Sequence, residues 1–266
     1  MSRIDYAFER LRADKKMAFI AYICAGDPSM EATPKIVAAL EEAGADIVEL
    51  GVPFSDPIAD GPTIQAATQR ALERGATIRG IFDVVKDIRT RSDVPIALMG
   101  YYNPIFHYGE KRFVAQAAKA GVDGLIIPDL SPEEADPLIA PARKHNVSTI
   151  FFIAPTSTPE RIELSDERST GFIYCTSVTG ITGARKALPP ELKRSLNKLR
   201  KVTDKPLAVG FGISKPEHVR MLRGHADGVI VGSAICKIVG KDRKLTKATL
   251  GRVTRLVKSL ARETKK

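Results

Sequence analysis

The chain has 266 residues, of which 44% are hydrophobic, 27% are charged and 6% are aromatic. This composition is that of an ordinary globular protein, and it excludes a largely disordered chain. The formal net charge of +10 raises nucleic-acid binding as a function. Much of the excess, however, lies on one expected amphipathic helix near the C-terminus, without an aromatic platform or a recognised motif, so we expect no nucleic-acid partner.

Location and metal content can be predicted from what the sequence lacks. No apolar run approaches the roughly 18 residues of a membrane span, and the first residues lack the apolar segment of a signal peptide. We therefore expect a cytoplasmic protein with no membrane partner. The three cysteines and four histidines show no metal-ligand spacing. We expect reduced cysteines in the core and no metal site.

Strand-like and helix-like runs alternate along the whole chain. The strand-like runs are eight short apolar stretches, at residues 18–23, 47–50, 96–99, 125–127, 149–153, 172–175, 207–209 and 229–231. This order predicts a mostly parallel sheet covered by helices. Eight such units in one chain favour a single α/β domain over residues 1–266, a (β/α)8 barrel, which typically takes about 250 residues. An open doubly wound sheet with fewer strands is the alternative.

Three features refine the barrel prediction. An expected helix over residues 4–11 is placed to cap the bottom of the barrel. A glycine that stops a helix, then an aspartate and a buried strand, recur at residues 43–47, 120–125 and 224–229, and this weak repetition favours the barrel over the open sheet. Ser214 and Glu217 predict a capping box at the start of the helix after the seventh strand.

Glycines follow the last two expected strands. Residues 210–214 read Gly-Phe-Gly-Ile-Ser, and Gly232 and Ser233 open a short extra helix that is expected to run to residue 239. Glycine lets backbone N–H groups approach an anion, and a helix N-terminus favours negative charge. Because barrels commonly bind phosphate after strands seven and eight, we predict a phosphate site here, to which Gly183 in the preceding loop can add an N–H. Ordinary structural turns are the alternative.

Carboxylates near the second strand are the candidates for chemistry. Glu49 lies in an otherwise apolar strand, and the barrel mouth is a cheaper place for its charge than the interface with the helices. Partial desolvation there raises the pKa of a carboxyl group and suits it to general acid/base work. A structural ion pair with a lysine or arginine is the alternative. Asp56 and Asp60, on the loop that follows, cannot be ranked from the residues alone, since either can bond backbone amides in a turn.

The sequence lacks the motifs of several other kinds of catalytic site. There is no nucleophile elbow, no P-loop lysine and no lysine placed for a Schiff base. The glycine- and threonine-rich stretch at residues 176–185 is either a lid that excludes water or a plain flexible loop. What remains is acid/base chemistry by carboxylates on a phosphorylated substrate.

The string from Glu49 to Gln65, ELGVPFSDPIADGPTIQ, resembles the hallmark of the tryptophan synthase alpha chain family. Supporting resemblances lie along nearly the whole chain, at residues 26–28, 101–106, 128–130, 178–183, 210–214 and 232–233. The resemblance implies retro-aldol cleavage of indole-3-glycerol phosphate to indole and D-glyceraldehyde 3-phosphate, with no cofactor in this chain. It also ranks Asp60 above Asp56.

The resemblance assigns a role to each site residue. Glu49 becomes the acid/base that manages the protons at indole C3 and at the side-chain hydroxyl, and Asp60 hydrogen-bonds the indole N–H. Tyr174 matches an active-site tyrosine, and Thr182 matches a lid threonine that contacts the aspartate. Tyr22 stands where a phenylalanine often lines the indole pocket, so a more polar wall is expected. The remaining substrate-binding positions are Tyr101 and the phosphate ligands Gly183, Gly212, Gly232 and Ser233.

The resemblance also implies a partner, a beta chain that carries pyridoxal phosphate and receives indole through a tunnel in an α2β2 tetramer. A free-standing lyase of the same family is the alternative within the family. A different phosphate-binding barrel, such as a sugar-phosphate isomerase or epimerase, is the rival enzyme. A non-catalytic activator of a beta chain is the rival from another class, and its mark would be the loss of Glu49 or Asp60, which are both present.

Overall fold

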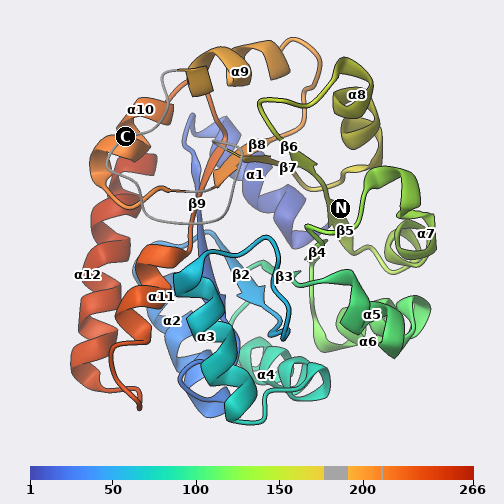
Figure 1. Ribbon diagram of the computed structural model, residues 1–266. Helices are drawn as coiled ribbons and strands as arrows, with labels where there is room; N and C mark the ends of the chain where they lie inside the picture. Colours follow the sequence, from blue (N-terminus) through green and yellow to red (C-terminus); the bar gives the residue numbers. More distant parts are fainter. Residues whose placement is uncertain (177–190, 211) are drawn as a thin grey trace.

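The computed structural model describes residues 1–176, 191–210 and 212–266, and its strands form one parallel sheet (Figure 1). The sheet order is β5-β4-β3-β2-β1-β9-β8-β7-β6. The strands are β1 (Ala18–Cys24), β2 (Ile47–Gly51), β3 (Ile96–Met99), β4 (Gly124–Ile126), β5 (Ser148–Ile150), β6 (Phe152–Ile153), β7 (Ile173–Thr176), β8 (Leu207–Gly210) and β9 (Gly228–Val231).

The two edges of this sheet belong to one continuous stretch of chain. Only Phe151 separates β5 from β6, and β5 pairs with β4 while β6 pairs with β7. The chain therefore closes the barrel as it passes from β5 to β6, which together correspond to the fifth strand expected from the sequence. The predicted (β/α)8 barrel and the position of each of its eight strands are confirmed, with boundaries that differ by a residue or two.

Helices surround the strands, as expected for parallel strands that are joined by crossover connections. Those described are α1 (Arg3–Ala13), α2 (Thr33–Glu42), α3 (Pro62–Glu73), α4 (Ile78–Arg89), α5 (Tyr102–Tyr108), α6 (Glu110–Ala120), α7 (Asp136–Lys144), α8 (Pro159–Arg168), α9 (Glu191–Leu199), α10 (Pro216–Leu222), α11 (Ser233–Val239) and α12 (Lys247–Thr264), with short 3-10 turns at Met30–Ala32 and Pro132–Glu134. None of the helices in these ranges combines the length and the apolar character that a membrane span needs.

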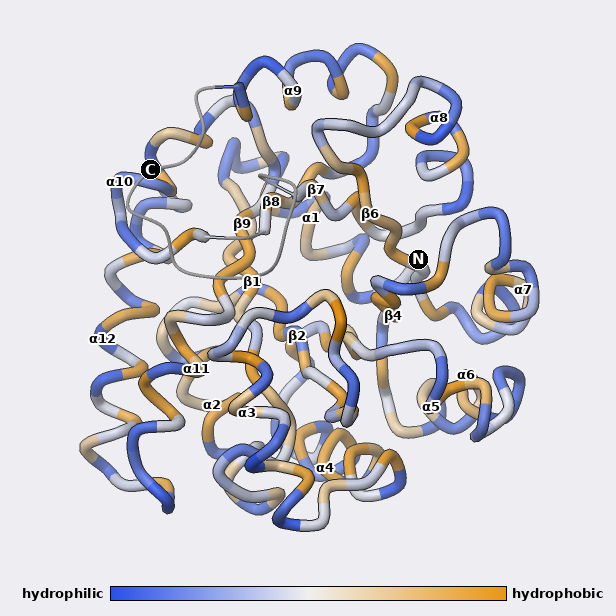
Figure 2. Tube along the Cα trace, viewed as in Figure 1, coloured by the Kyte–Doolittle hydropathy of each residue, from blue (hydrophilic) through white to orange (hydrophobic). Residues whose placement is uncertain are grey.

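Side chains alternate along each strand between two buried clusters. On β1, Phe19 and Ile23 face the helices, whereas Ile20 and Tyr22 point into the barrel. Both directions are buried, so the strands are hydrophobic almost throughout, and Figure 2 shows them mainly in orange. This period of two decides which strand residues point into the barrel.

Helix α1 closes the N-terminal end of the barrel, as the sequence predicted. Ile4, Phe8 and Leu11 belong to the cluster inside the barrel, and the ring of Phe8 lies 5.6 Å from that of Phe172. In Figure 1 this helix is seen behind the ring of strands. Because α1 fills the N-terminal end, a site in the barrel is expected at the opposite, C-terminal end.

The prediction of a capping box at Ser214 is wrong. Helix α10 begins at Pro216 and its N-cap is Lys215, without a side-chain cap. Glu217 is therefore the second residue of the helix rather than the third. Proline is favoured at the first helical position because it lacks an N–H and has a helical φ, and this preference places the start of α10 one residue later than Ser214 requires.

The short helix after the last strand and the basic C-terminal helix both match the predictions from the sequence. Helix α11 runs from Ser233 to Val239, the bounds that were expected. Helix α12 is amphipathic and buries Val253, Val257 and Leu260 against the barrel.

Candidate active site

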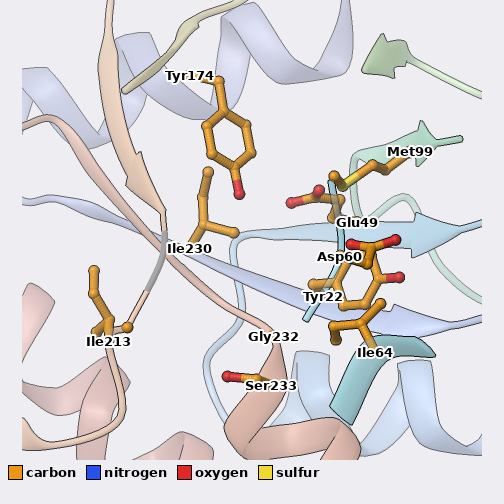
Figure 3. Close-up of a pocket in the computed structure, with 11 residues that line it drawn as sticks. Tyr22, Glu49, Asp60, Ile64, Met99, Tyr174, Ile213, Ile230, Gly232 and Ser233 are labelled. Carbon is orange, nitrogen blue, oxygen red and sulfur yellow. The ribbon is translucent and has the colours of Figure 1, made fainter. Parts of the chain in front are cut away.

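A pocket with an empty volume of about 430 Å3, including its mouth, lies at the C-terminal ends of the strands (Figure 3). This is the end of a (β/α)8 barrel at which loops of differing sequence can build a site. The pocket is lined by Tyr22, Glu49, Asp60, Ile64, Met99, Tyr174, Gly212, Ile213, Ile230, Gly232 and Ser233.

Glu49 points into the barrel from the middle of β2. Val48 and Leu50 face the helices, so the alternation along the strand directs Glu49 inward, between Tyr22 on β1 and Ala97 on β3. The residue is fully buried, and neither carboxyl oxygen has a hydrogen-bond partner among the residues that the structure describes. The alternative of a structural ion pair with lysine or arginine therefore finds no support in the described part of the chain.

Burial changes the protonation of Glu49. Desolvation, reinforced by the nearby charge of Asp60, raises the pKa of Glu49 from its ordinary value of 4.5 to about 8. The carboxyl group thus holds a proton at neutral pH and can both donate it and take it back. Burying a carboxyl group without a partner destabilises a protein core. In an active site, however, the raised pKa that results keeps the group protonated until substrate binds, as a general acid requires.

Asp60 lies on the loop between β2 and α3 and is held from two sides. The Tyr101 hydroxyl donates a hydrogen bond to Oδ2 of Asp60 at 2.9 Å, and the backbone N–H of Ala59 donates to the same hydroxyl at 3.0 Å. The side-chain amide of Gln65 donates to the carbonyl oxygen of Asp60 at 2.7 Å. The pKa of Asp60 rises to about 6 through desolvation, which the hydrogen bond from Tyr101 opposes. At neutral pH Asp60 is therefore mainly a carboxylate.

The structure separates Asp60 from Asp56. Asp56 is exposed and accepts a hydrogen bond from the hydroxyl of its neighbour Ser55. It lines a different hollow, together with residues of α3. Asp60 is 6% exposed and lines the pocket. Only Asp60 can therefore act together with Glu49.

Two tyrosines form the walls of the pocket, and glycines on neighbouring strands make room for them. A Cβ on Gly51 of β2 would lie 2.2 Å from the Tyr22 hydroxyl, and one on Gly210 of β8 would lie 2.3 Å from the Tyr174 hydroxyl. The ring of Tyr174 also lies 4.5 Å from that of Phe152. Desolvation raises the pKa of both tyrosines well above the ordinary value, so both hydroxyls stay protonated.

The glycine-rich end of the pocket lies across from the carboxylates (Figure 3). Gly212, Gly232 and Ser233 line it together, and α11 begins at Ser233 without a side-chain cap. A Cβ on Gly232 would lie 3.1 Å from the Tyr22 ring. The Tyr22 side chain thus extends from Gly232, after β9, toward Gly51 of β2.

The structure brings most of the predicted site residues together. Tyr22, Glu49, Asp60, Tyr174, Gly212, Gly232 and Ser233 all line the one pocket. Tyr101 does not line it and lies behind Asp60. Thr182 and Gly183 lie outside the described residues.

Apolar lining residues were missed by the sequence reasoning. Ile64, Met99, Ile213 and Ile230 contribute most of the apolar wall. Met99 and Ile230 could have been predicted from the sequence, because side chains alternate along a strand and both of these point into the barrel. In the described ranges, no group of three or more His, Cys, Asp or Glu residues is placed to hold a metal ion.

Comparison with known proteins gives one consistent result. Residues 8–265 match the profile of a family described as tryptophan synthase alpha chain. A relative from Thermoanaerobacter sp. (strain X514), named tryptophan synthase alpha chain, is 48% identical over 91% of this chain and 92% of its own length. One of the same name from Geobacter sulfurreducens is 47% identical over 99% and 98%.

Solved structures that resemble this chain come from the same family. Tryptophan synthase subunit alpha from Legionella pneumophila str. Paris superposes with a TM-score of 0.91 at 38% identity, covering 99% of this chain and 98% of that one. A chain of Mycobacterium tuberculosis tryptophan synthase superposes with a TM-score of 0.91 at 36% identity, covering 100% and 99%.

Proposed function

Because this chain belongs to the tryptophan synthase alpha chain family, we propose that its pocket is the site at which a carbon-carbon lyase cleaves indole-3-glycerol phosphate to indole and D-glyceraldehyde 3-phosphate. One observation carries the proposal at the level of residues. A buried carboxyl group without a hydrogen-bond partner among the described residues, Glu49, shares a pocket with a second carboxylate, Asp60, opposite a glycine-rich end.

The two carboxyl groups divide the work. Glu49, protonated at neutral pH because of its raised pKa, donates its proton to C3 of the indole ring. The ring then becomes an indolenine-like tautomer with positive charge at its nitrogen. Asp60, as a carboxylate, accepts the hydrogen bond of that N–H and stabilises the charge.

Bond cleavage follows from a second proton transfer, this time from the substrate to Glu49. The Glu49 carboxylate removes the proton of the side-chain hydroxyl next to C3, and that oxygen becomes the aldehyde of glyceraldehyde 3-phosphate. The electrons of the broken carbon-carbon bond return to the ring and neutralise the nitrogen, so that indole leaves. Glu49 ends the cycle protonated, as it began.

The other residues hold the substrate in place. The apolar side chains Ile64, Met99 and Ile230 receive the indole ring, and the walls of the pocket are Tyr22 and Tyr174. The phosphate is bound by backbone N–H groups at Gly212, Gly232 and Ser233. Tyr101 acts through Asp60, which its hydroxyl orients. For Thr182 and Gly183, contact with Asp60 and with phosphate stays a prediction.

We further propose that this chain works in the cytoplasm as one barrel domain and uses no cofactor of its own. In this proposal indole passes to a tryptophan synthase beta chain, which carries pyridoxal phosphate, within an α2β2 tetramer. A free-standing indole-releasing lyase is the alternative. The chemistry of the pocket is the same in both cases.

Two experiments test these proposals. The purified chain mixed with indole-3-glycerol phosphate is expected to release indole; turnover of a pentose phosphate without indole release would instead favour the isomerase. Gel filtration with a cognate beta chain is expected to show a complex with the mass of an α2β2 tetramer. Separate elution would favour the free-standing lyase.

A further inference from the structure

An ion pair links α3 to the loop after β1, beside the pocket. Asp27, in the loop after β1, is 2% exposed, and its carboxylate accepts two hydrogen bonds from Arg70 of α3, from Nε at 2.9 Å and from Nη2 at 2.8 Å. A planar guanidinium that binds both carboxylate oxygens fixes direction as well as distance. The pair therefore orients α3 relative to the end of β1.

Arg70 also lies against the end of α11. A Cβ built on Gly240, the C-cap residue of α11, would lie 2.2 Å from Nη2 of Arg70. The φ of Gly240 is −73°, which any residue adopts, so the reason for glycine here is space for the guanidinium. Arg70 thus contacts the loop after β1 and the end of α11 at the same time.

Small side chains belong to the buried cluster beside this pair. Ala67 and Ala71 of α3 belong to the same buried cluster as Cys24 of β1 and Cys236 of α11, and α3 packs directly on α11. Helices resist sliding when large side chains interdigitate as ridges and grooves. Small side chains interdigitate little, so the ion pair with Asp27, together with the contact of Arg70 with Gly240, selects one position of α3 against β1 and α11.

The two helices carry opposite ends of the pocket. Helix α3 begins directly after Asp60 and Gly61, and Gln65 of its first turn donates to the carbonyl oxygen of Asp60. Helix α11 begins at Ser233, at the phosphate end. Figure 3 shows Ile64 on α3 and Ser233 on α11 converging on the same pocket. A shift of α3 along α11 changes the distance between these ends.

We propose that the Asp27–Arg70 pair fixes the spacing between the indole end and the phosphate end of the pocket, with Arg70 as a positioning residue. The inference rests on the proposed function, because only a substrate that spans both ends needs them at one distance. Indole alone or glyceraldehyde 3-phosphate alone engages one end and does not need the pair. A misplacement of about 1 Å costs a spanning substrate on the order of 100-fold in rate.

The kinetic test uses Arg70→Lys, which keeps the charge but loses the two-point contact. We expect kcat/KM for indole-3-glycerol phosphate to fall about 10- to 100-fold, while the dissociation constants of indole and of glyceraldehyde 3-phosphate, each measured alone by calorimetry, stay at wild-type values. The matched control is Arg74→Lys at the C-cap of the same helix, where the exposed guanidinium donates to the carbonyl oxygen of Arg243; it should match the wild type. Wild-type kcat/KM in Arg70→Lys, or an equal loss for each half-ligand, overturns the inference.

A second measurement does not depend on turnover. Nitroxide labels on Gln69→Cys of α3 and Lys237→Cys of α11, both exposed positions, report the spacing of the helices by electron paramagnetic resonance. We expect the label distances to shift or broaden when Arg70→Lys is added, and not when Arg74→Lys is added. An unchanged distribution refutes the positioning role even if the wild type cleaves no indole-3-glycerol phosphate, a result that by itself would refute the proposed function.

Discussion

Replacing Glu49 with glutamine keeps the size of the side chain and removes its proton. In the proposed mechanism Glu49 makes two proton transfers in each turnover, and a positioned acid or base typically contributes 10²- to 10⁴-fold. We expect Glu49→Gln to lower kcat for indole release by about 10³-fold or more, whereas binding of the beta chain, where present, survives. Retained cleavage would refute the acid/base role.

The same substitution has a measurable effect on stability. In the unfolded chain Glu49 loses its proton near its ordinary pKa of 4.5, whereas in the folded protein its pKa is about 8. The folded state therefore binds more protons than the unfolded state between these pH values, and its stability falls as pH rises from about 4.5 to 8. A tenfold change in proton affinity is worth about 1.4 kcal/mol, so the total loss is of the order of 5 kcal/mol. Glutamine does not titrate and removes this loss.

Urea unfolding of the wild type and Glu49→Gln at pH 5, 7 and 9 measures the effect. The free energies of unfolding should be similar at pH 5, and the variant should be the more stable protein at pH 9 by several kcal/mol. Glu42→Gln, the same change at an exposed position of α2, should follow the wild type at every pH. If the difference between the wild type and Glu49→Gln does not grow with pH, the premise of a buried, protonated Glu49 is wrong.

Three further changes test the rest of the site. The pKa values of about 6 for Asp60 and about 8 for Glu49 predict a bell-shaped pH profile of kcat/KM with its maximum near pH 7, because Asp60 must be ionised and Glu49 protonated; a flat profile between pH 5 and 9 would contradict this assignment. Tyr101→Phe removes the hydrogen bond that lowers the pKa of Asp60, so we expect the acidic limb to move to higher pH and kcat/KM at pH 6 to fall by about tenfold, with less effect at pH 8. Gly51→Ala places a methyl group 2.2 Å from the Tyr22 hydroxyl and should cost about 1–3 kcal/mol in thermal unfolding and raise KM; adding Tyr22→Phe, which removes the nearest atom, should restore part of both.

The strands were predictable because their signal is local. Buried parallel strands give short apolar runs, and the alternation of side chains along each run is a property of the extended backbone itself. The inward direction of Glu49 follows from that alternation once its neighbours Val48 and Leu50 face the helices. The start of α10 was misplaced because a preference of Pro216 outweighed the capping pattern at Ser214.

In the loop after β2, local sequence signals do not identify which aspartate belongs to the site. Asp56 and Asp60 have similar neighbours in the sequence, and the residues alone left them equal as candidates. Their difference arises from Tyr101, which is 41 positions from Asp60 along the chain and donates to its carboxylate. Contacts between distant segments of this kind are set by how the loops pack over the barrel mouth.

By itself, the sequence determined the order of strands and helices, the buried carboxylate on β2 and the glycines after β8 and β9, because each depends on residues close together in the chain. The tertiary structure placed Asp60 and not Asp56 in the pocket with Glu49, a choice that the individual residues left open and the family resemblance favoured. It also decided that Gly51 makes room for Tyr22 and that Arg70 joins Asp27 beside Gly240. Each of these depends on atoms that meet only when separate βα units pack together, and no period or motif within one unit encodes such a distance.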